Sequence, residues 1–254
     1  MSENLKFLAF DTSTDQMSIA LTDGVRIWQH SGPGGAQASG TLIPAIMALL
    51  AESGLVLGDL RAIVFGRGPG SFTGLRTACA VAQGLAFGAD AGRGVEVLPV
   101  DTLMAVAEEA RFQLHGEAVD CLRVTAMLDA RMDEMYVQAY EFSGGMCRQV
   151  KRCELIRPEN MVLDNDGELL AGNVFEVYAG RLPTALSRFE QVHALPTATA
   201  LLRLAPQLAA AGQCVAASQA LPLYVRDKVA FTTEERALAK AEKERAAQSL
   251  IDQA

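Results

Sequence analysis

Residues 66–76, Gly66-Arg-Gly-Pro-Gly-Ser-Phe-Thr-Gly-Leu-Arg76, follow directly on the apolar run Ala62-Ile-Val-Phe65 and precede a segment of helical character. A strand, a glycine-rich turn and a helix N-terminus in this order are typical of a phosphate-binding loop. A Walker loop requires Gly-Lys-Ser/Thr at its end, whereas Gly74 is followed by Leu75. A dinucleotide fingerprint requires a third glycine at position 71, where this chain has Ser71. The turn can accept an anion, but it matches neither nucleotide motif.

The pattern around this turn predicts a mixed sheet covered by helices. We expect strands over residues 6–10, 16–21, 25–29, 62–65 and 95–98, and helices over 41–53, 72–87 and 102–112. Alternating strands and helices favour parallel pairing, whereas the two leading turns favour an antiparallel edge. The fold class is therefore α/β, in the order of the ribonuclease-H-like half of actin and the sugar kinases.

The second half of the chain begins in the same way as the first. Strand-like runs cover residues 122–128 and 134–142, a Gly-Gly turn follows, and a helix is predicted over 197–211. We interpret this as a degenerate duplication that gives two related domains, each with a mixed sheet flanked by helices. The predicted divisions are an N-terminal domain over 1–106, a C-terminal domain over 107–230 and a charged tail, helical or disordered, over 231–254.

Composition restricts the classes of function. Twenty-two Lys and Arg against thirty Asp and Glu give a net charge of −8, the wrong sign for a surface that holds nucleic acid, so any RNA would be bound by partners. Five cysteines without a Cys-x-x-Cys pair predict neither a disulfide framework nor a zinc knuckle. The N-terminus has no leader pattern and no long apolar run follows, so we expect a cytoplasmic protein without a membrane anchor.

A second anion candidate is Asp11-Thr-Ser-Thr-Asp15, which lies between the first two predicted strands. Hydroxyls and backbone N–H groups there can face a phosphate, although a plain hairpin turn has the same composition. The candidate cofactor-binding residues are therefore Asp11, Ser13, Gly68 and Gly70. No metal site or catalytic residue is predicted, because the three histidines are dispersed and no Gly-x-Ser-x-Gly elbow occurs.

The helix predicted over residues 72–87 is apolar or small on nearly every face. Such a helix does not suit the surface of a monomer, so one face should cover the sheet and the other should meet another chain. The alternative is that a larger second domain covers the outer face. The predicted partner interface comprises Phe72, Leu75, Arg76, Cys79, Ala82, Gln83, Leu85 and Phe87.

Several motifs together resemble the bacterial TsaB (YeaZ) family of tRNA threonylcarbamoyladenosine biosynthesis proteins. They are Leu8-Ala-Phe-Asp-Thr-Ser-Thr14, Gly68-Pro-Gly-Ser-Phe-Thr-Gly-Leu-Arg76, Leu98-Pro-Val-Asp-Thr-Leu103, Asp129-Ala-Arg-Met-Asp-Glu-Met-Tyr136 and Leu221-Pro-Leu-Tyr-Val-Arg226. The resemblance extends over nearly the whole chain to about residue 229, and the extension after Phe231 has no counterpart in the family pattern.

The resemblance implies an actin-like ATPase fold that keeps the shape of its catalytic paralogue, TsaD, without the chemistry. The paralogue carries a His-x-x-x-His metal pair, and here Thr102 and Val106 stand at the matching positions. The second phosphate loop of such enzymes needs glycines, which Asp129-Ala-Arg131 does not supply. The chain is then not an enzyme and has no cofactor of its own, although ATP or ADP can be held at a partner interface.

The resemblance also implies partners. The family member forms a homodimer when alone, pairs with TsaD through helices of the N-terminal domain, and works with the P-loop ATPase TsaE. The complex transfers threonylcarbamoyl from threonylcarbamoyl-AMP to the adenosine beside the anticodon of tRNAs that read codons beginning with A. The alternative from the enzyme class is a residual ATPase or a metallopeptidase-like activity of the same superfamily.

Overall fold

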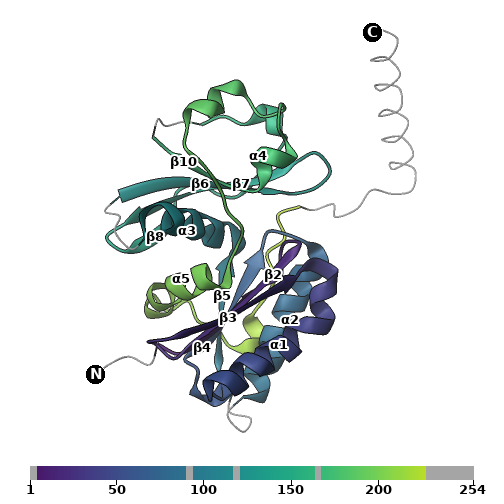
Figure 1. The fold of residues 1–254 in the computed structure, drawn as a ribbon, viewed down its shortest axis with the longest axis vertical. Coiled ribbons are helices and arrows are strands. Elements are labelled where there is room, and N and C mark those ends of the chain that lie inside the picture. The colour runs from purple at the N-terminus through teal and green to yellow at the C-terminus, as the bar shows by residue number, and fades with distance from the viewer. Residues whose placement is uncertain (1–4, 90–93, 117–120, 164–166, 227–254) are drawn as a thin grey trace, which may run out of the picture.

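The molecule consists of two β-sheets stacked end to end, with two helices between them (Figure 1). The computed structural model describes residues 5–89, 94–116, 121–163 and 167–226. The tail predicted over 231–254 lies outside these residues. In the described part of the chain, no helix is both long and apolar enough to cross a lipid bilayer.

The first sheet has five strands in the order β3-β2-β1-β4-β5. Its strands are β1 (Phe7–Asp11), β2 (Gln16–Thr22), β3 (Ile27–Pro33), β4 (Ala62–Gly68) and β5 (Glu96–Asp101). β2 is antiparallel to both β1 and β3, whereas β4 is parallel to β1 and β5. The mixed five-stranded sheet predicted from the sequence is therefore confirmed.

The second sheet repeats this order as β8-β7-β6-β10-β11, with β9 also paired to β7. Its strands are β6 (Cys121–Asp129), β7 (Met135–Ser143), β8 (Met146–Gln149), β9 (Glu154–Ile156), β10 (Leu169–Gly172) and β11 (Gln191–His193). β6 is antiparallel to β7 and parallel to β10, as β1 is to β2 and β4. The predicted duplication and the actin-like fold are confirmed, although β10 and β11, of four and three residues, were not predicted.

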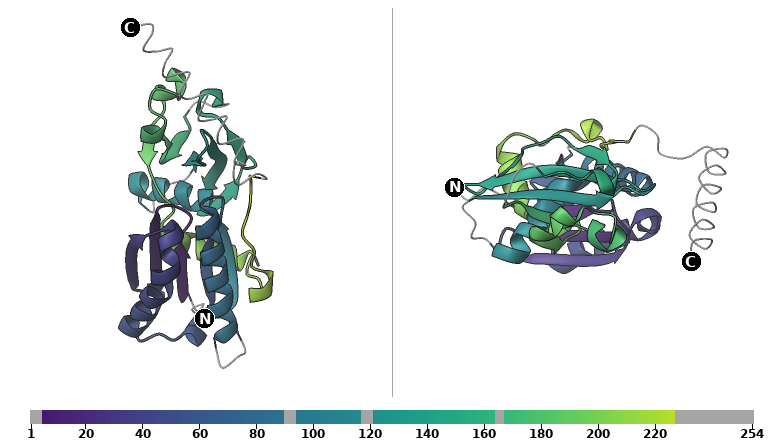
Figure 2. Two further views of the ribbon diagram at one scale, coloured as in Figure 1. Left: turned by 90° about the vertical axis from the view of Figure 1, so that its right-hand side faces the viewer. Right: turned by 90° about the horizontal axis from the view of Figure 1, so that it is seen from above.

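Two helices cover the outer face of the first sheet and two lie between the sheets (Figures 1 and 2). The α-helices are α1 (Ala38–Ser53), α2 (Phe72–Gly88), α3 (Thr102–His115), α4 (Val174–Val177) and α5 (Ala198–Ala210). The 3-10 turns are η1 (Gly35–Gln37), η2 (Leu57–Asp59), η4 (Pro158–Asn160), η5 (Thr184–Arg188) and η6 (Ala217–Gln219). α1 and α2 form the outer layer.

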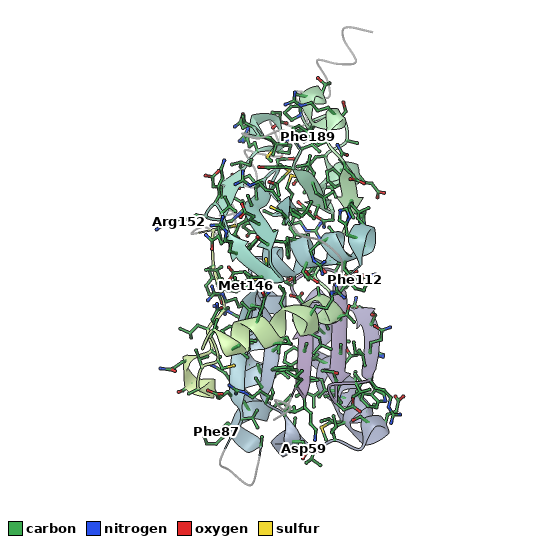
Figure 3. The ribbon with its side chains drawn as sticks, turned by 90° about the vertical axis from the view of Figure 1, so that its left-hand side faces the viewer. Asp59, Phe87, Phe112, Met146, Arg152 and Phe189 are labelled. Carbon is green, nitrogen blue, oxygen red and sulfur yellow. The ribbon has the colours of Figure 1, made fainter. Side chains whose placement is uncertain are left out.

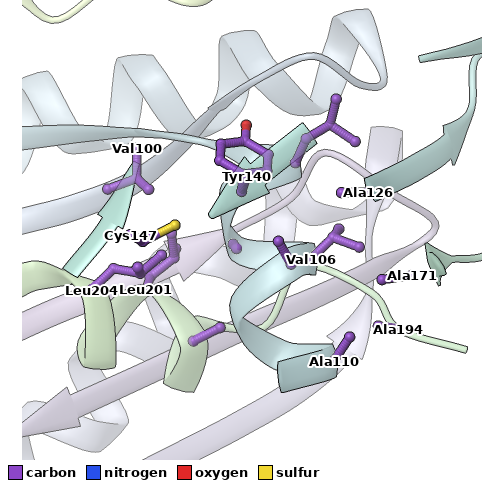
Figure 4. Close-up of a cluster of buried hydrophobic side chains, with 14 of the residues drawn as sticks. Val100, Val106, Ala110, Ala126, Tyr140, Cys147, Ala171, Ala194, Leu201 and Leu204 are labelled. Atoms are coloured by element: carbon purple, nitrogen blue, oxygen red, sulfur yellow. The ribbon is translucent and has the colours of Figure 1, made fainter. Parts of the chain in front are cut away.

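The two halves exchange their last α-helices. α3 belongs to the first half but packs on β6, β7 and β10, whereas α5 belongs to the second half and packs on β1, β2 and β4. The predicted division at residues 106 and 107 falls inside α3, which is one continuous helix. The junction therefore forms part of the largest hydrophobic cluster, where Val106, Ala110, Ala126 and Ala171 are fully buried (Figure 4).

The glycine-rich turn between β4 and α2 is packed directly on the loop between β1 and β2. A Cβ added at Gly74 would overlap the carbonyl oxygen of Thr12, and one added at Gly66 would overlap the carboxylate of Asp11. The contact is closed by hydrogen bonds from the Thr12 hydroxyl to the Gly74 carbonyl oxygen (2.7 Å) and from Ser71 N–H to the Ser13 carbonyl oxygen (2.7 Å). Only glycine lets the two backbones approach this closely.

Gly74→Ala should destabilise the fold by about 1–3 kcal/mol, because the added methyl group forces α2 away from the β1–β2 loop. Gly84→Ala is the matched control, since Gly84 lies in the same helix with nothing within 4 Å of an added Cβ. Gly84→Ala should raise the free energy of unfolding by about 0.5–1 kcal/mol. Urea unfolding of both variants tests this, and equal effects would contradict the packing argument.

Candidate functional site

A cleft of about 270 Å³ opens between the two domains. It is formed by the β1–β2 loop, the start of α2, and the β6–β7 turn. The lining residues are Ser13, Thr14, Asp15, Gly70, Ser71, Phe72, Leu128, Asp129, Ala130, Arg131, Met132, Tyr136, Asn173 and Arg226.

Two of the four candidate cofactor-binding residues line this cleft and two do not. Ser13 and Gly70 are part of its wall, whereas Asp11 and Gly68 are not among the lining residues. Asp11 is fully buried, and Gly68 is packed between Leu75 and the carbonyl oxygen of Leu223. Asp11 and Ser13 are two positions apart, as are Gly68 and Gly70, but only one residue of each pair faces the cleft.

Asp11 is a buried carboxylate held by neutral hydrogen-bond donors. Its Oδ1 accepts from the backbone N–H (2.7 Å) and the hydroxyl (2.6 Å) of Ser13, and its Oδ2 accepts from the Thr102 hydroxyl (3.4 Å). Burial raises the pKa of Asp11 to about 6, and the hydrogen bonds from Ser13 and Thr102 oppose that increase. The side chain therefore organises the loop from within rather than facing a ligand.

Several polar groups of the glycine-rich turn are engaged by its own chain. Ser71 is the N-cap of α2 and accepts from Gly74 N–H, while its own N–H is donated to Ser13. A Cβ at Gly70 would lie 2.7 Å from the Ser13 carbonyl oxygen, so this glycine also serves the contact between the two loops. The turn resembles a phosphate cradle in sequence but in three dimensions it is a packing element.

The opposite wall of the cleft is the β6–β7 turn, in which Arg131, Met132 and Asp133 all have a left-handed backbone, with φ of 58°, 58° and 60°. Non-glycine residues rarely adopt this conformation. The Arg131 guanidinium spans the cleft to Asp15 Oδ2 (2.8 Å) and also contacts Asp129 (3.3 Å). Side chains, and not glycine backbone, therefore line this wall of the cleft.

Thr102 and Val106, at which the resemblance places the histidine pair of the paralogue, lie in the protein interior. Thr102 accepts a hydrogen bond from Gly68 N–H (3.1 Å) and Val106 packs in the junction cluster (Figure 4). Across the described residues there is no group of three or more His, Cys, Asp or Glu that could bind a metal ion. These two positions offer no ligand that zinc or iron favours.

Known proteins agree with this fold and these motifs. A family model described as "TsaD: tRNA N6-adenosine threonylcarbamoyltransferase" matches residues 35–251. Proteins called "tRNA threonylcarbamoyladenosine biosynthesis protein TsaB" from Haemophilus influenzae and Escherichia coli are 33% and 32% identical, over 90% and 89% of this chain and 97% of each relative. The solved structure of "YeaZ from Pseudomonas aeruginosa" is 38% identical with a TM-score of 0.76, over 87% of this chain and 99% of that one. This chain belongs to the TsaB (YeaZ) family.

The predicted partner interface on α2 needs correction. Leu75, Cys79 and Ala82 are buried inside this chain and cannot contact a partner. Gln83 and Leu85 are half-buried, whereas Phe72, Arg76 and Phe87 are exposed. The packing of Gly74 on Thr12 turns the Leu75 row inward, and the outward row of α2 carries Thr73, Ala80, Gly84 and Phe87.

The C-terminal segment covers much of the α2 face that was assigned to a partner. The carbonyl oxygen of Ala220 accepts from Cys79 Sγ (3.2 Å) and Gln83 Nε2 (2.8 Å), and the Tyr224 hydroxyl accepts from Arg76 Nε (3.0 Å). The alternative, in which the second half of the chain covers this face of α2, is thus correct for these residues. The segment Leu221-Pro-Leu-Tyr-Val-Arg226 was a motif without an assigned role, and this contact supplies one.

Asp11→Asn should change how stability depends on pH. A carboxyl whose pKa rises from 3.8 unfolded to about 6 folded favours folding below pH 4, and this contribution is lost as pH rises through 6. Relative to the Asn variant, the native chain should lose about 3 kcal/mol between these limits. Urea unfolding from pH 4 to pH 7.5 measures it, and parallel curves for both proteins would contradict the burial argument.

Proposed function

We propose that this chain is a non-catalytic subunit in the biosynthesis of threonylcarbamoyladenosine in tRNA, which binds and activates the TsaD paralogue. The observation that carries the proposal is the burial of Thr102 and Val106, the positions at which the resemblance places the metal-binding histidine pair of the paralogue. The relatives that match nearly the whole chain bear the TsaB name. The complex would transfer threonylcarbamoyl from threonylcarbamoyl-AMP to tRNA.

The cleft supports a chain without a nucleotide cofactor of its own. Both arginines of its lining are already paired, Arg131 with Asp15 and Asp129, and Arg226 with Glu134. A triphosphate would have to displace these carboxylates and would meet side chains where the fold normally presents glycine backbone. ATP or ADP would then be held only together with a partner.

The partner surface in this proposal is the outer layer of the first domain. α1 exposes Ile43 and Met47 at 46% and 50%, and α2 exposes Phe87 at 78%, at the end of the molecule far from the second sheet (Figure 3). On the same helix, Ala80 and Gly84 are small and exposed, which lets another helix approach closely. The same surface would serve the homodimer and the TsaD pairing, so the two assemblies would compete.

The roles that we propose for the remaining partners are those that the family resemblance implies. The net charge of −8 assigns the tRNA to the other subunits, and TsaE would supply ATP hydrolysis in a cytoplasmic complex. Co-purification with TsaD on a sizing column, followed by modification of tRNA with and without this chain, tests the proposal. Modification should require the chain, and full modification in its absence would overturn the proposed role.

A residual ATPase or metallopeptidase is the competing function, since one similar structure is described as "an uncharacterized protein with similarity to peptidase YEAZ from Pseudomonas aeruginosa". The purified chain should release no phosphate from Mg-ATP above the background and should cleave no peptide. Phosphate release that falls in Asp15→Asn, a change in the cleft wall, would establish the enzyme instead.

Ala80→Glu should weaken homodimer and TsaD binding at least tenfold while leaving the fold intact, because it places a charge in the centre of an apolar contact. Ala210→Glu, at an exposed position in α5, is the matched control and should leave both assemblies unchanged. Sedimentation velocity and a binding titration with TsaD measure the two assemblies. A loss of only one would show that they use different surfaces.

A further inference from the structure

The segment after η6, residues 220–226, runs along α2 and then reaches the second domain, and we call it the strap (Figure 2). Its start is fastened to the first domain. Ala220 accepts from two side chains of α2, Leu223 N–H donates to the carbonyl oxygen of Arg67 (2.7 Å), and Tyr224 stacks near Phe72 with ring centroids 5.5 Å apart. The first part of the strap is thus tied to β4 and α2.

The end of the strap is fastened to the second domain through Arg226. The Arg226 side chain is only 9% exposed, and its Nη2 donates to Glu134 Oε2 (2.6 Å) and to the carbonyl oxygen of Arg131 (3.1 Å). Both acceptors belong to the β6–β7 turn, which is the far wall of the cleft. Arg226 therefore joins the two walls through one short piece of chain.

The turn that receives Arg226 is held in place from several sides. Ala130 N–H donates to the Glu134 carbonyl oxygen (2.9 Å), and Arg181 pairs with Asp133 (2.8 Å). These contacts keep three successive residues in a left-handed backbone that L side chains disfavour. Because the turn is constrained in this way, a displacement of Arg226 moves β6 and β7 together with the turn and does not merely deform the turn.

The opposite side of the domain junction is also closed. Glu108 of α3, with its side chain 4% exposed, lies between Arg111 of the same helix and Arg203 of α5. Glu109 accepts from Arg203 and from the Thr197 hydroxyl (2.6 Å) at the start of α5. The exchanged helices are thus joined behind the cleft, while the strap joins the domains in front of it.

We propose that the strap is a latch that holds the two domains at one angle, so that this cleft does not open and close around a nucleotide. Arg226 is its principal contact, because it is buried, whereas the Asp15–Arg131 pair across the cleft is exposed and correspondingly weak. The latch goes beyond the proposed role in tRNA modification and does not depend on it. It also makes α2, the strap and the β6–β7 turn one rigid surface.

Single-molecule energy transfer between dyes at Ile27 of β3 and Val177 of α4 measures the angle between the domains. Both side chains are exposed, at 55% and 52%. Non-natural amino acids should carry the dyes, because the chain has five cysteines, and picomolar samples avoid dimers. The native chain should give one narrow distribution that millimolar Mg-ATP does not move.

Arg226→Ala should at least double the width of that distribution, and Arg226→Lys should give an intermediate width, which keeps the test valid if the alanine variant folds poorly. Arg148→Ala is the control, because Arg148 pairs with Glu141 within the second domain alone. A native distribution that is broad or shifts with Mg-ATP would overturn the latch. Arg226 variants whose distance distributions are as narrow as that of the Arg148→Ala control would also overturn the latch.

Discussion

The rest of the structure depends on the contact between the glycine-rich turn and the loop that follows β1. Gly66, Gly70 and Gly74 each lie where a Cβ would collide with residues 11–13, and at Gly70 and Gly74 the collision is with backbone atoms. This contact sets the rotation of α2 about its axis and thereby decides which of its residues face outward. It also engages Ser13 and Ser71, the groups that a phosphate would need.

The same contact is one of three that hold the walls of the cleft together. Here glycine packing joins the near loop to α2, Arg131 reaches Asp15 across the opening, and Arg226 ties the C-terminal strap to the far turn. Protein side chains thus supply the cohesion between the domains, and the outer layer of helices remains open to partners.

The hydrophobic core at the domain junction also joins the two halves of the chain. Because α3 and α5 exchange between the halves, each sheet is covered on its inner face by a helix from the other half. Val106 is fully buried in that core. Its side chain contributes packing to the junction and offers no metal ligand.

The sequence by itself determined the element order of the first half, the paired strands that open the second half, and the missing nucleotide and metal motifs, because these depend on spacing within a few residues. The tertiary structure alone decided which face of α2 is free, that Asp11 lies beneath the cleft, and that the C-terminal motif is a strap. Those features rest on contacts between residues far apart in the chain, such as Cys79 with Ala220, separated by 141 positions, and Glu134 with Arg226, separated by 92. Local periodicity shows that a helix has two apolar faces, but only long-range packing selects the one that is buried.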